Sequence, residues 1–281
     1  NATPTAVWEF TVVPVGTPVP TPTPTPVPTA VSDERNITLD PGFELAGNLT
    51  QGRWGLTVTV LDNGTVIAVG GQERRSFSRN APTEAELLAA GSTEWLKTEA
   101  THFERSFHIA VPLPDGRLLV AGGSGREVLS DEEAQDRPFR GRQDLTSAEV
   151  YDPKTGEWSD VADMETGRQS AGGVLLQDGR VLVAGGSDGI SVIANAEVYD
   201  PDADVWVEAA PMSQIRKFHT ATLLMDGRVL MVGGQTRETA LASAEIYDPS
   251  DDSWAPVADL ARPRSGHSAS LLRDGRVIVI G

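Results

Sequence analysis

The chain has 281 residues, enough for one large or two small domains, and its lack of cysteine excludes disulfides, thiolate metal sites and cysteine nucleophiles. Its 23 basic and 40 acidic residues give a net charge of −17, which repels nucleic acid and anionic membranes. We therefore expect no nucleic-acid partner. No apolar run approaches the ~18 residues of a membrane-spanning helix, so we also expect no membrane insertion. The chain stops at Gly281 within a repeating pattern, and we expect it to be part of a longer protein.

The first predicted element is a strand near the start of the chain. Trp8, Phe10 and Val12 alternate with Glu9 and Thr11, which is the period of a half-buried strand. Because a strand cannot stand alone, we interpret residues 1–15 as the end of a preceding β domain. The stretch resembles the closing strand of Ig-like modules in bacterial surface proteins.

A linker is predicted next, over residues 16–36. Thr17 to Thr29 reads "TPVPTPTPTPVPT", and alternating proline removes backbone donors and fixes φ. Such a run forms an extended, semi-stiff spacer of ~3.1 Å per residue. The composition resembles the interdomain linkers of bacterial extracellular proteins.

Residues 37–281 repeat one pattern, and the repeat determines the predicted fold. Each copy begins with Arg and holds two apolar runs around Asp-Gly or Asn-Gly, the pair best suited to a two-residue hairpin turn. Complete copies end in Gly-Gly. The copies start 52, 63, 48 and 48 residues apart, at Arg53, Arg105, Arg168, Arg216 and Arg264.

A second half-motif follows, of the type "AEVYDP…W", in which Tyr precedes Trp by seven residues. It begins at Ala148, Ala196 and Ala244, and Asp-Pro marks the turn inside it. Each repeat therefore predicts four short antiparallel strands, here termed a, b, c and d.

"AELLAAGSTEW", Ala85 to Trp95, is rich in good helix formers but occupies the position of this second half-motif. We predict strand c, a turn and strand d there, because neighbouring units leave a sheet-shaped space. Counting ten residues back from Arg53 places Phe43 where other repeats have Trp. We interpret the segment from Phe43 to Leu49 as an orphan d strand that completes the last unit and closes a ring.

Gly-Gly, Tyr and Trp in four-stranded units of about 48 residues resemble the kelch repeat, whose units are blades of a β-propeller. The resemblance covers Phe43 to Gly281 and implies an all-β propeller, with four complete blades and a partial fifth. It also implies six or seven blades in the whole ring, and a structural role for the Tyr and Trp residues.

Variable b–c loops and the d–a loops share one face of such a propeller, and variable loops on a rigid scaffold are where binding usually resides. We predict a site there for an acidic peptide or a uronate-type glycan, because thirteen of the 23 basic residues fall on this face and Arg suits carboxylates. The alternative is that nearby acids neutralise the loop arginines and that the repeat arginines brace the blades. The candidate residues are Arg74, Arg75, Arg79, Arg137, Arg140 and Arg142 in the loops, and the repeat arginines Arg53, Arg105, Arg168, Arg216 and Arg264.

No cofactor or metal site is predicted. His108, His219 and His267 share one repeat position, which favours polar packing over a metal. The Asp-x-Asp-x-Asp run from Asp200 to Asp204 lacks the Gly and Glu of a calcium loop and favours a solvated turn. Some kelch-like propellers are copper oxidases with a Tyr–Cys crosslink, but this chain has no Cys.

Three functions stay open from sequence. The first is a non-catalytic module that binds a protein or glycan, in a secreted or surface-anchored bacterial protein. The second is a carbohydrate-active enzyme, such as a sugar oxidase or epimerase, whose site lies partly in missing blades. The third is a structural spacer without a ligand.

Overall fold

A computed structural model describes residues 7–8, 47–72, 83–128 and 142–281, and within these ranges the chain contains strands and no helix. None of the described residues belongs to a helix that could cross a membrane. The fold is built from four four-stranded antiparallel sheets, which we number as blades 1 to 4. The prediction of an all-β fold made of kelch-type blades is confirmed.

The blades follow one another along the chain. Blade 1 contains β2 (Thr57–Val60), β3 (Val66–Val69), β4 (Glu84–Leu88) and β5 (Trp95–Ala100). Blade 2 contains β7 (Ile109–Pro112), β8 (Leu118–Ala121), β11 (Ala148–Asp152) and β12 (Glu157–Val161). Blade 3 contains β13 (Gly172–Leu175), β14 (Val181–Ala184), β15 (Ala196–Asp200) and β16 (Val205–Ala209). Blade 4 contains β17 (Thr220–Leu223), β18 (Val229–Val232), β19 (Ala244–Asp248) and β20 (Ser253–Val257).

Two smaller sheets complete the described structure. The partial fifth blade contains β21 (Ser268–Leu271) and β22 (Val277–Ile280), and β1 (Val7–Trp8) pairs with β22. A three-stranded sheet contains β6 (Phe103–Ser106), β9 (Ser124–Glu127) and β10 (Gln143–Asp144). This second sheet was not predicted, and it extends the d–a and b–c loops of blade 2.

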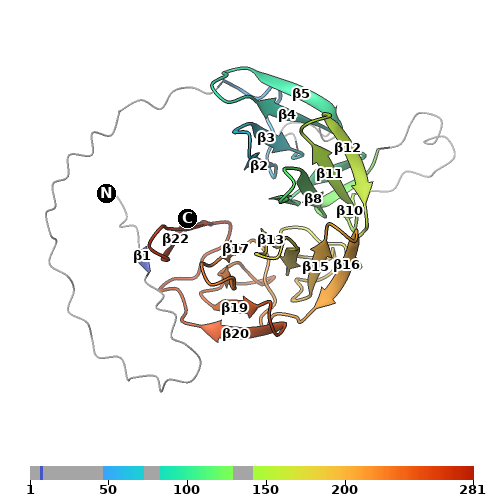
Figure 1. Cartoon of the computed structure of the whole chain (residues 1–281). Coiled ribbons are helices and arrows are strands. Elements are labelled where there is room, and N and C mark those ends of the chain that lie inside the picture. Colours follow the sequence, from blue (N-terminus) through green and yellow to red (C-terminus); the bar gives the residue numbers. More distant parts are fainter. Residues whose placement is uncertain (1–6, 9–46, 73–82, 129–141) are drawn as a thin grey trace, which may run out of the picture.

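The blades lie side by side in an arc around a common axis (Figure 1). The first strands β2, β7, β13, β17 and β21 contact one another in that order and surround the axis. Figure 1 shows a gap between blade 1 and the partial fifth blade, so the ring is not closed.

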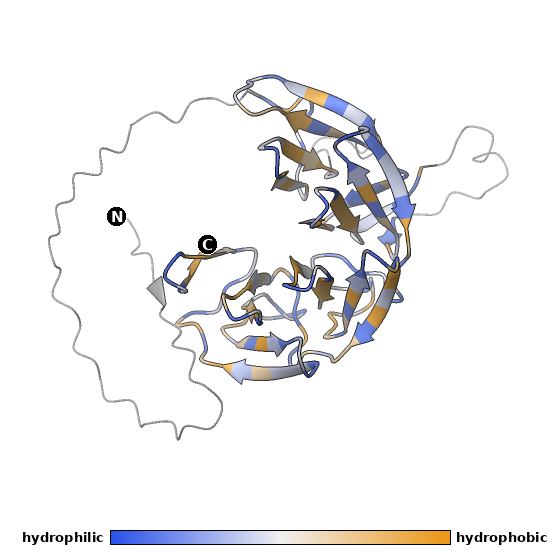
Figure 2. Ribbon diagram, in the orientation of Figure 1, coloured by the Kyte–Doolittle hydropathy of each residue, from blue (hydrophilic) through white to orange (hydrophobic). Residues whose placement is uncertain are grey.

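Apolar side chains of neighbouring blades form the core. The second strand of each complete blade is almost fully buried, and Figure 2 shows the apolar colour concentrated on inner strands. Val181 and Val183 of blade 3, for example, pack in one cluster with Val111 and Leu119 of blade 2. Each blade thus buries its apolar face against the next, which a single sheet cannot do alone.

The Tyr and Trp of the second half-motif join adjacent blades. The rings of Tyr199 and Trp206 are in tilted contact with centroids 5.0 Å apart, and Trp206 Nε1 donates to the Ala162 carbonyl at 2.8 Å. Asp204 accepts both the Tyr199 hydroxyl and the Ala162 N–H, at 2.9 and 2.8 Å. The carboxylate at the end of the Asp-x-Asp-x-Asp run therefore joins two blades. Asp200 caps the N–H groups of Asp202 and Ala203, as expected for a turn.

The stretch from Ala85 to Trp95 is strand, turn and strand, as the repeat register predicted. β4 pairs with β3 on one side and with β5 on the other, with Leu87 opposite both Ile67 and Leu96. Tertiary pairing overrides the local preference for helix. Phe43, in the predicted orphan strand, lies outside the described residues. Gly47, which is within that segment and is described, lies directly against the Thr93 carbonyl in the c–d turn of blade 1.

β1 occupies the third position of the partial fifth blade. Trp8 is opposite Val277 and Val7 is opposite Ile278. In blade 3 the corresponding pair is Tyr199 opposite Val181. The preceding Ig-like domain and the linker stay predictions.

Candidate ligand-binding face

The repeat arginines are buried. Arg105, Arg168 and Arg216 are at most 1% exposed, and the Arg53 side chain is 1% exposed. Each pairs with a glutamate on the third strand of its own blade, at 2.5–2.7 Å: Glu86, Glu149, Glu197 and Glu245. A ligand cannot reach these guanidinium groups without breaking the pairs. The burial and the ion pairs favour the alternative, that these four arginines brace the blades, and their ligand-binding role stays a prediction.

The brace in blade 4 shows how complete these networks are. Arg216 Nη1 donates to the carbonyls of Gly233 and Ser243, at 2.7 and 3.0 Å, and Nη2 pairs with Glu245 at 2.7 Å. Glu245 also accepts the N–H groups of Ser213 and Gln214 in the d–a link. Burial alone raises the pKa of Glu245, but these hydrogen bonds and Arg216 outweigh it and hold that pKa below its usual value.

Two of the remaining candidate arginines, Arg264 and Arg142, lie among the described residues. Half-buried Arg264 donates to the Gly281 carbonyl at 2.8 Å. Exposed Arg142 donates to Ser106 Oγ at 2.8 Å and lies 3.7 Å from Glu104, which also pairs with Arg126 at 2.7 Å. The other loop arginines lie outside the described residues: Arg74, Arg75, Arg79, Arg137 and Arg140.

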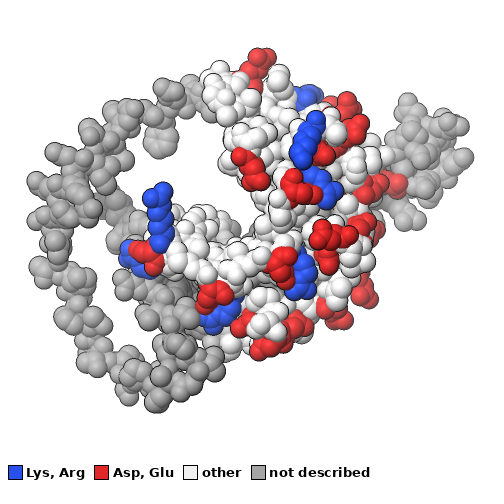
Figure 3. All heavy atoms as spheres, viewed as in Figure 1, with Lys and Arg blue, Asp and Glu red and all other residues white. Residues whose placement is uncertain are grey.

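The arginines of the a–b turns are also paired. The Arg of each Asp-Gly-Arg turn between strands a and b pairs with the Asp two residues before it, at 2.5–2.7 Å. Figure 3 shows the same intermixing of basic and acidic side chains over the face it presents. On the face drawn in Figure 3, the described basic side chains therefore form no continuous patch that would select an acidic ligand.

A chain of backbone hydrogen bonds runs from blade to blade on the face opposite the a–b turns, where the d–a loops reach the axis. The residue two after each repeat Arg donates its N–H to the equivalent residue of the preceding blade. Gly266, Phe218, Ser170, Phe107 and Gly55 are linked in this way, at 2.7–2.9 Å. All five have positive φ, between 55° and 69°. For the three that are not glycine this backbone costs about 1–3 kcal/mol each, and such strain often accompanies ligand sites.

We call the residues around this end of the axis the axial rim. They are the first and second residues after each repeat Arg, and the residue after each Gly-Gly pair. Backbone bridges such as Trp54 to Gln72 and Lys217 to Gln235 hold the two sets together. The rim consists of Trp54, Gly55, Gln72, Ser106, Phe107, Ser124, Gln169, Ser170, Ser187, Lys217, Phe218, Gln235, Ser265 and Gly266.

Aromatic rings form one side of the axial rim. Phe107 lies edge-on to Trp54 at 5.1 Å and to Phe218 at 5.9 Å between centroids. Trp54 is 49% exposed, and Lys217 Nζ lies 5.7 Å from the Phe218 ring. Exposed Trp beside polar side chains is a common composition of binding hot spots.

Ile190 adds an exposed apolar side chain on the same face. It stands at the tip of the b–c loop of blade 3 and is 85% exposed. Asp188 Oδ1 accepts the N–H groups of Ile190 and Ser191, at 2.9 and 2.7 Å, so the loop tip is a closed turn. The turn holds an apolar group in water, a position that becomes favourable when a partner covers it.

Asp144 is an unusual acid beside the rim. Gln169 Nε2 donates to Asp144 Oδ1 at 2.8 Å, while Oδ2 is buried without a partner. Burial first, and then the nearby Asp188, raise the pKa of Asp144 to about 6. Between the ordinary Asp pKa and this value, the folded chain binds a proton more tightly than the unfolded chain. This contribution to stability is therefore present at low pH and lost as the pH rises through about 6.

Replacing Asp144 with Asn should therefore stabilise the chain near neutral pH, by at most about 1 kcal/mol once solvent screening is allowed for. Near pH ~4 the native Asp144 is protonated, and the gain should disappear. Thermal unfolding of both chains across this range measures the effect. A gain that does not change with pH would contradict the assignment.

The histidines at the shared repeat position pack between blades, which supports the packing interpretation. His108 Nε2 lies 2.8 Å from Thr57 Oγ1, and His267 Nε2 lies 3.1 Å from Thr220 Oγ1. Burial lowers the pKa of His108 and His219 to about 3, so both rings are neutral.

A copper–tyrosine oxidase site does not fit the described residues. All three tyrosines are buried in blade packing, where Tyr199 and Tyr247 donate to Asp204 and Asp252 at 2.9 and 2.8 Å. The three buried histidines lie at the interfaces between first strands.

Sequence reasoning missed two features of this region. One is the positive φ of Phe107 and Phe218, for which the glycines at the equivalent positions 55 and 266 were the available signal. The other is His102, which is exposed and lies close to Asp160 and Glu149.

Comparison with known proteins agrees with this architecture. The Kelch motif matches residues 107–165, 170–213 and 216–261, together a little over half of the chain. Kelch-like protein 15 of Danio rerio is 29% identical over 167 residues, which are 55% of this chain and 26% of that protein. Kelch-like protein 15 of Homo sapiens is 33% identical over 92 residues, or 33% of this chain and 14% of that protein. The matches thus span about a quarter or less of these relatives' length.

A solved structure also resembles the chain. It is a fungal alcohol oxidase of the AA5 family in complex with copper, with a TM-score of 0.52 and 17% sequence identity. The alignment covers 81% of this chain and 58% of that protein. At this identity the likeness shows the fold alone.

Proposed function

Since the chain belongs to the kelch-repeat family, we propose that it is a protein-binding propeller module that acts through its axial rim. The observation that carries the proposal is the aromatic side of the rim, where half-exposed Trp54 lies against Phe107, Phe107 in turn contacts Phe218, and both Phe residues have strained backbone. Buried aromatic anchors surrounded by polar groups supply most of the energy in protein interfaces. Ile190 adds a second apolar anchor on the same face.

The acidic ligand expected from sequence is a narrower proposal. It now depends mainly on the loop arginines outside the described residues. Four of the repeat arginines are internal, and Glu104 pairs with both Arg126 and Arg142 and offsets one of their two charges. A glycan is the alternative ligand, since aromatic rings and amides also suit sugars. The proposal includes the extracellular or surface location and the bacterial origin that the Thr-Pro linker and the strand near Trp8 favour.

The test is binding of the purified chain to a peptide array and a glycan array. Replacing Trp54 with Ala and Ile190 with Ser should weaken peptide binding by about 30-fold or more, the effect of losing a hot spot. Met225 is a matched control, because it is a 59% exposed apolar side chain next to an a–b turn on the other face. Met225→Ser should bind as the native chain does.

Other results would contradict the proposal in recognisable ways. Binding to glycans alone would favour the carbohydrate-binding alternative. No binding to either array would favour the structural spacer. Peptide binding that survives the rim substitutions but falls in Met225→Ser would place the site on the opposite face.

The enzyme alternative has one supporting observation, the fold shared with the fungal oxidase. It needs catalytic groups beyond the described residues, and we derive no chemical step for it.

A further inference from the structure

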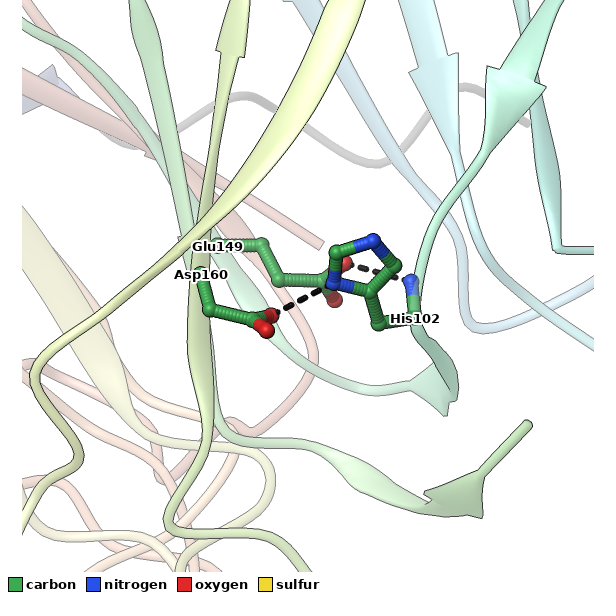
Figure 4. Close-up of side chains that lie close together, drawn as sticks. All are labelled: His102, Glu149 and Asp160. Atoms are coloured by element: carbon green, nitrogen blue, oxygen red, sulfur yellow. Dashed lines mark hydrogen bonds and ion pairs between the residues drawn. The ribbon is translucent and has the colours of Figure 1, made fainter. Parts of the chain in front are cut away.

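A cluster of three possible metal ligands lies on the outer side of blade 2, apart from the axial rim (Figure 4). His102 comes from the link between β5 and β6, Glu149 from β11 and Asp160 from β12. One ligand atom from each side chain lies within 4.8 Å of the others. His102 Nδ1 and Asp160 Oδ1 are 2.7 Å apart.

The three side chains differ in exposure in a way that suits a metal site. The side chains of His102 and Asp160 are 51% and 61% exposed, so an ion can reach them from solvent. Glu149 is fully buried beneath them. Figure 4 shows the imidazole and both carboxylates facing one another.

Glu149 is held in place but keeps lone pairs. Its Oε1 accepts the His102 N–H at 2.6 Å, and its Oε2 accepts Arg105 Nη2 at 2.5 Å. A carboxylate has about four acceptor positions, so each oxygen retains one. Neighbours that fix a ligand in this way usually raise the affinity of a metal site.

The nitrogen donor is peculiar to blade 2, whereas the buried glutamate recurs. The residue across from that glutamate on the fourth strand is Lys97 in blade 1, Glu208 in blade 3 and Pro256 in blade 4. The position of His102, three before the repeat Arg, holds Thr50, Glu165 and Ser213 in these blades. Only blade 2 thus combines an imidazole with two carboxylates among the described repeats.

The geometry points to a site for a zinc-type transition-metal ion, with His102, Asp160 and Glu149 as ligands and water in the remaining positions. One nitrogen and two carboxylates suit Zn²⁺, whereas Ca²⁺ and Mg²⁺ prefer oxygen-only sites. A bound ion would tie the link that enters blade 2 to strands β11 and β12. Because it binds only the folded chain, it would raise the unfolding temperature.

The experiment is a titration of the whole, chelator-treated chain with Zn²⁺, read by a metal indicator and by thermal unfolding. We expect one ion bound and a rise in the unfolding temperature, with no rise from Mg²⁺ or Ca²⁺. His102 is well suited to this assay, because the other three of the four histidines are buried.

Two variants make the test decisive. His102→Asn should weaken Zn²⁺ binding by at least ~10-fold while changing metal-free stability little, since its ion pair is exposed. Glu208→Gln is the control, because Glu208 is the blade 3 residue at the position that Asp160 has in blade 2. This variant should bind Zn²⁺ as the native chain does. Unchanged Zn²⁺ affinity in His102→Asn, or a native chain that does not bind Zn²⁺, would overturn the proposal.

Discussion

Replacing Arg216 with Met should lower the free energy of unfolding by about 3–5 kcal/mol, because it leaves a buried carboxylate without its counter-ion. Arg216 is 0% exposed and Glu245 is 2% exposed. The substitution also removes the guanidinium donors from the carbonyls of Gly233 and Ser243, which lie at 2.7 and 3.0 Å. Denaturant unfolding followed by tryptophan fluorescence measures the loss.

Arg117→Met is the matched control for this prediction. Arg117 pairs with Asp115 at 2.5 Å, but the two side chains are 37% and 49% exposed and belong to one turn. Exposed pairs contribute little, so this variant should lose less than about 1 kcal/mol. If Arg216→Met lost no more than Arg117→Met, the repeat arginines would not be braces, and their role as ligand contacts would need to be reconsidered.

The blade architecture was predictable because equivalent residues make the same contacts in successive repeats. Tyr199 and Tyr247 each contact the ring of a Trp seven residues later and donate to an Asp, with nearly identical distances. Counting from these positions also assigned Ala85 to Trp95 correctly against its helix propensity. The strands on both sides of β4 determine its conformation, and the regular spacing of the repeat indicates where those neighbouring strands lie.

The burial of the repeat arginines was not predictable in the same way. Arginine is seldom fully buried unless it is paired, and the partner of Arg216 is 29 residues further along the chain. Its glutamate was visible as the second letter of each "AEVY" motif, but nothing local connects the two. Only the folding of the c strand behind the d–a loop brings them together.

The three-stranded sheet β6, β9 and β10 was missed for a related reason. The sequence shows the b–c loop of blade 2 as a long variable insertion, and its length suggested binding. Its ends instead form a ribbon, in which Gly125 is opposite both Arg105 and Gln143. The ribbon has little alternation of apolar and polar residues, so the period of a strand is not visible.

Gly185→Ala should cost about 3–4 kcal/mol, through two additive effects. Gly185 has φ of +68°, where an L side chain is strained. A Cβ there would also lie 2.6 Å from the Arg216 carbonyl oxygen and 2.8 Å from Met212 Cε. That carbonyl accepts the Gly186 N–H at 2.8 Å, so the backbones of blades 3 and 4 would have to separate.

Gly179→Ala separates the two effects, because it keeps the backbone strain without the contact. Gly179 has φ of +90°, and its nearest neighbour would be Pro114 Cγ at 3.5 Å, an ordinary van der Waals distance. We expect this variant to lose only the ~1–2 kcal/mol of the left-handed backbone. The difference between the two variants, measured by denaturant unfolding, isolates the close approach of adjacent blades. Equal losses would mean that the blades can move apart freely, and that the Gly-Gly pair is kept for its backbone conformation rather than for blade contact.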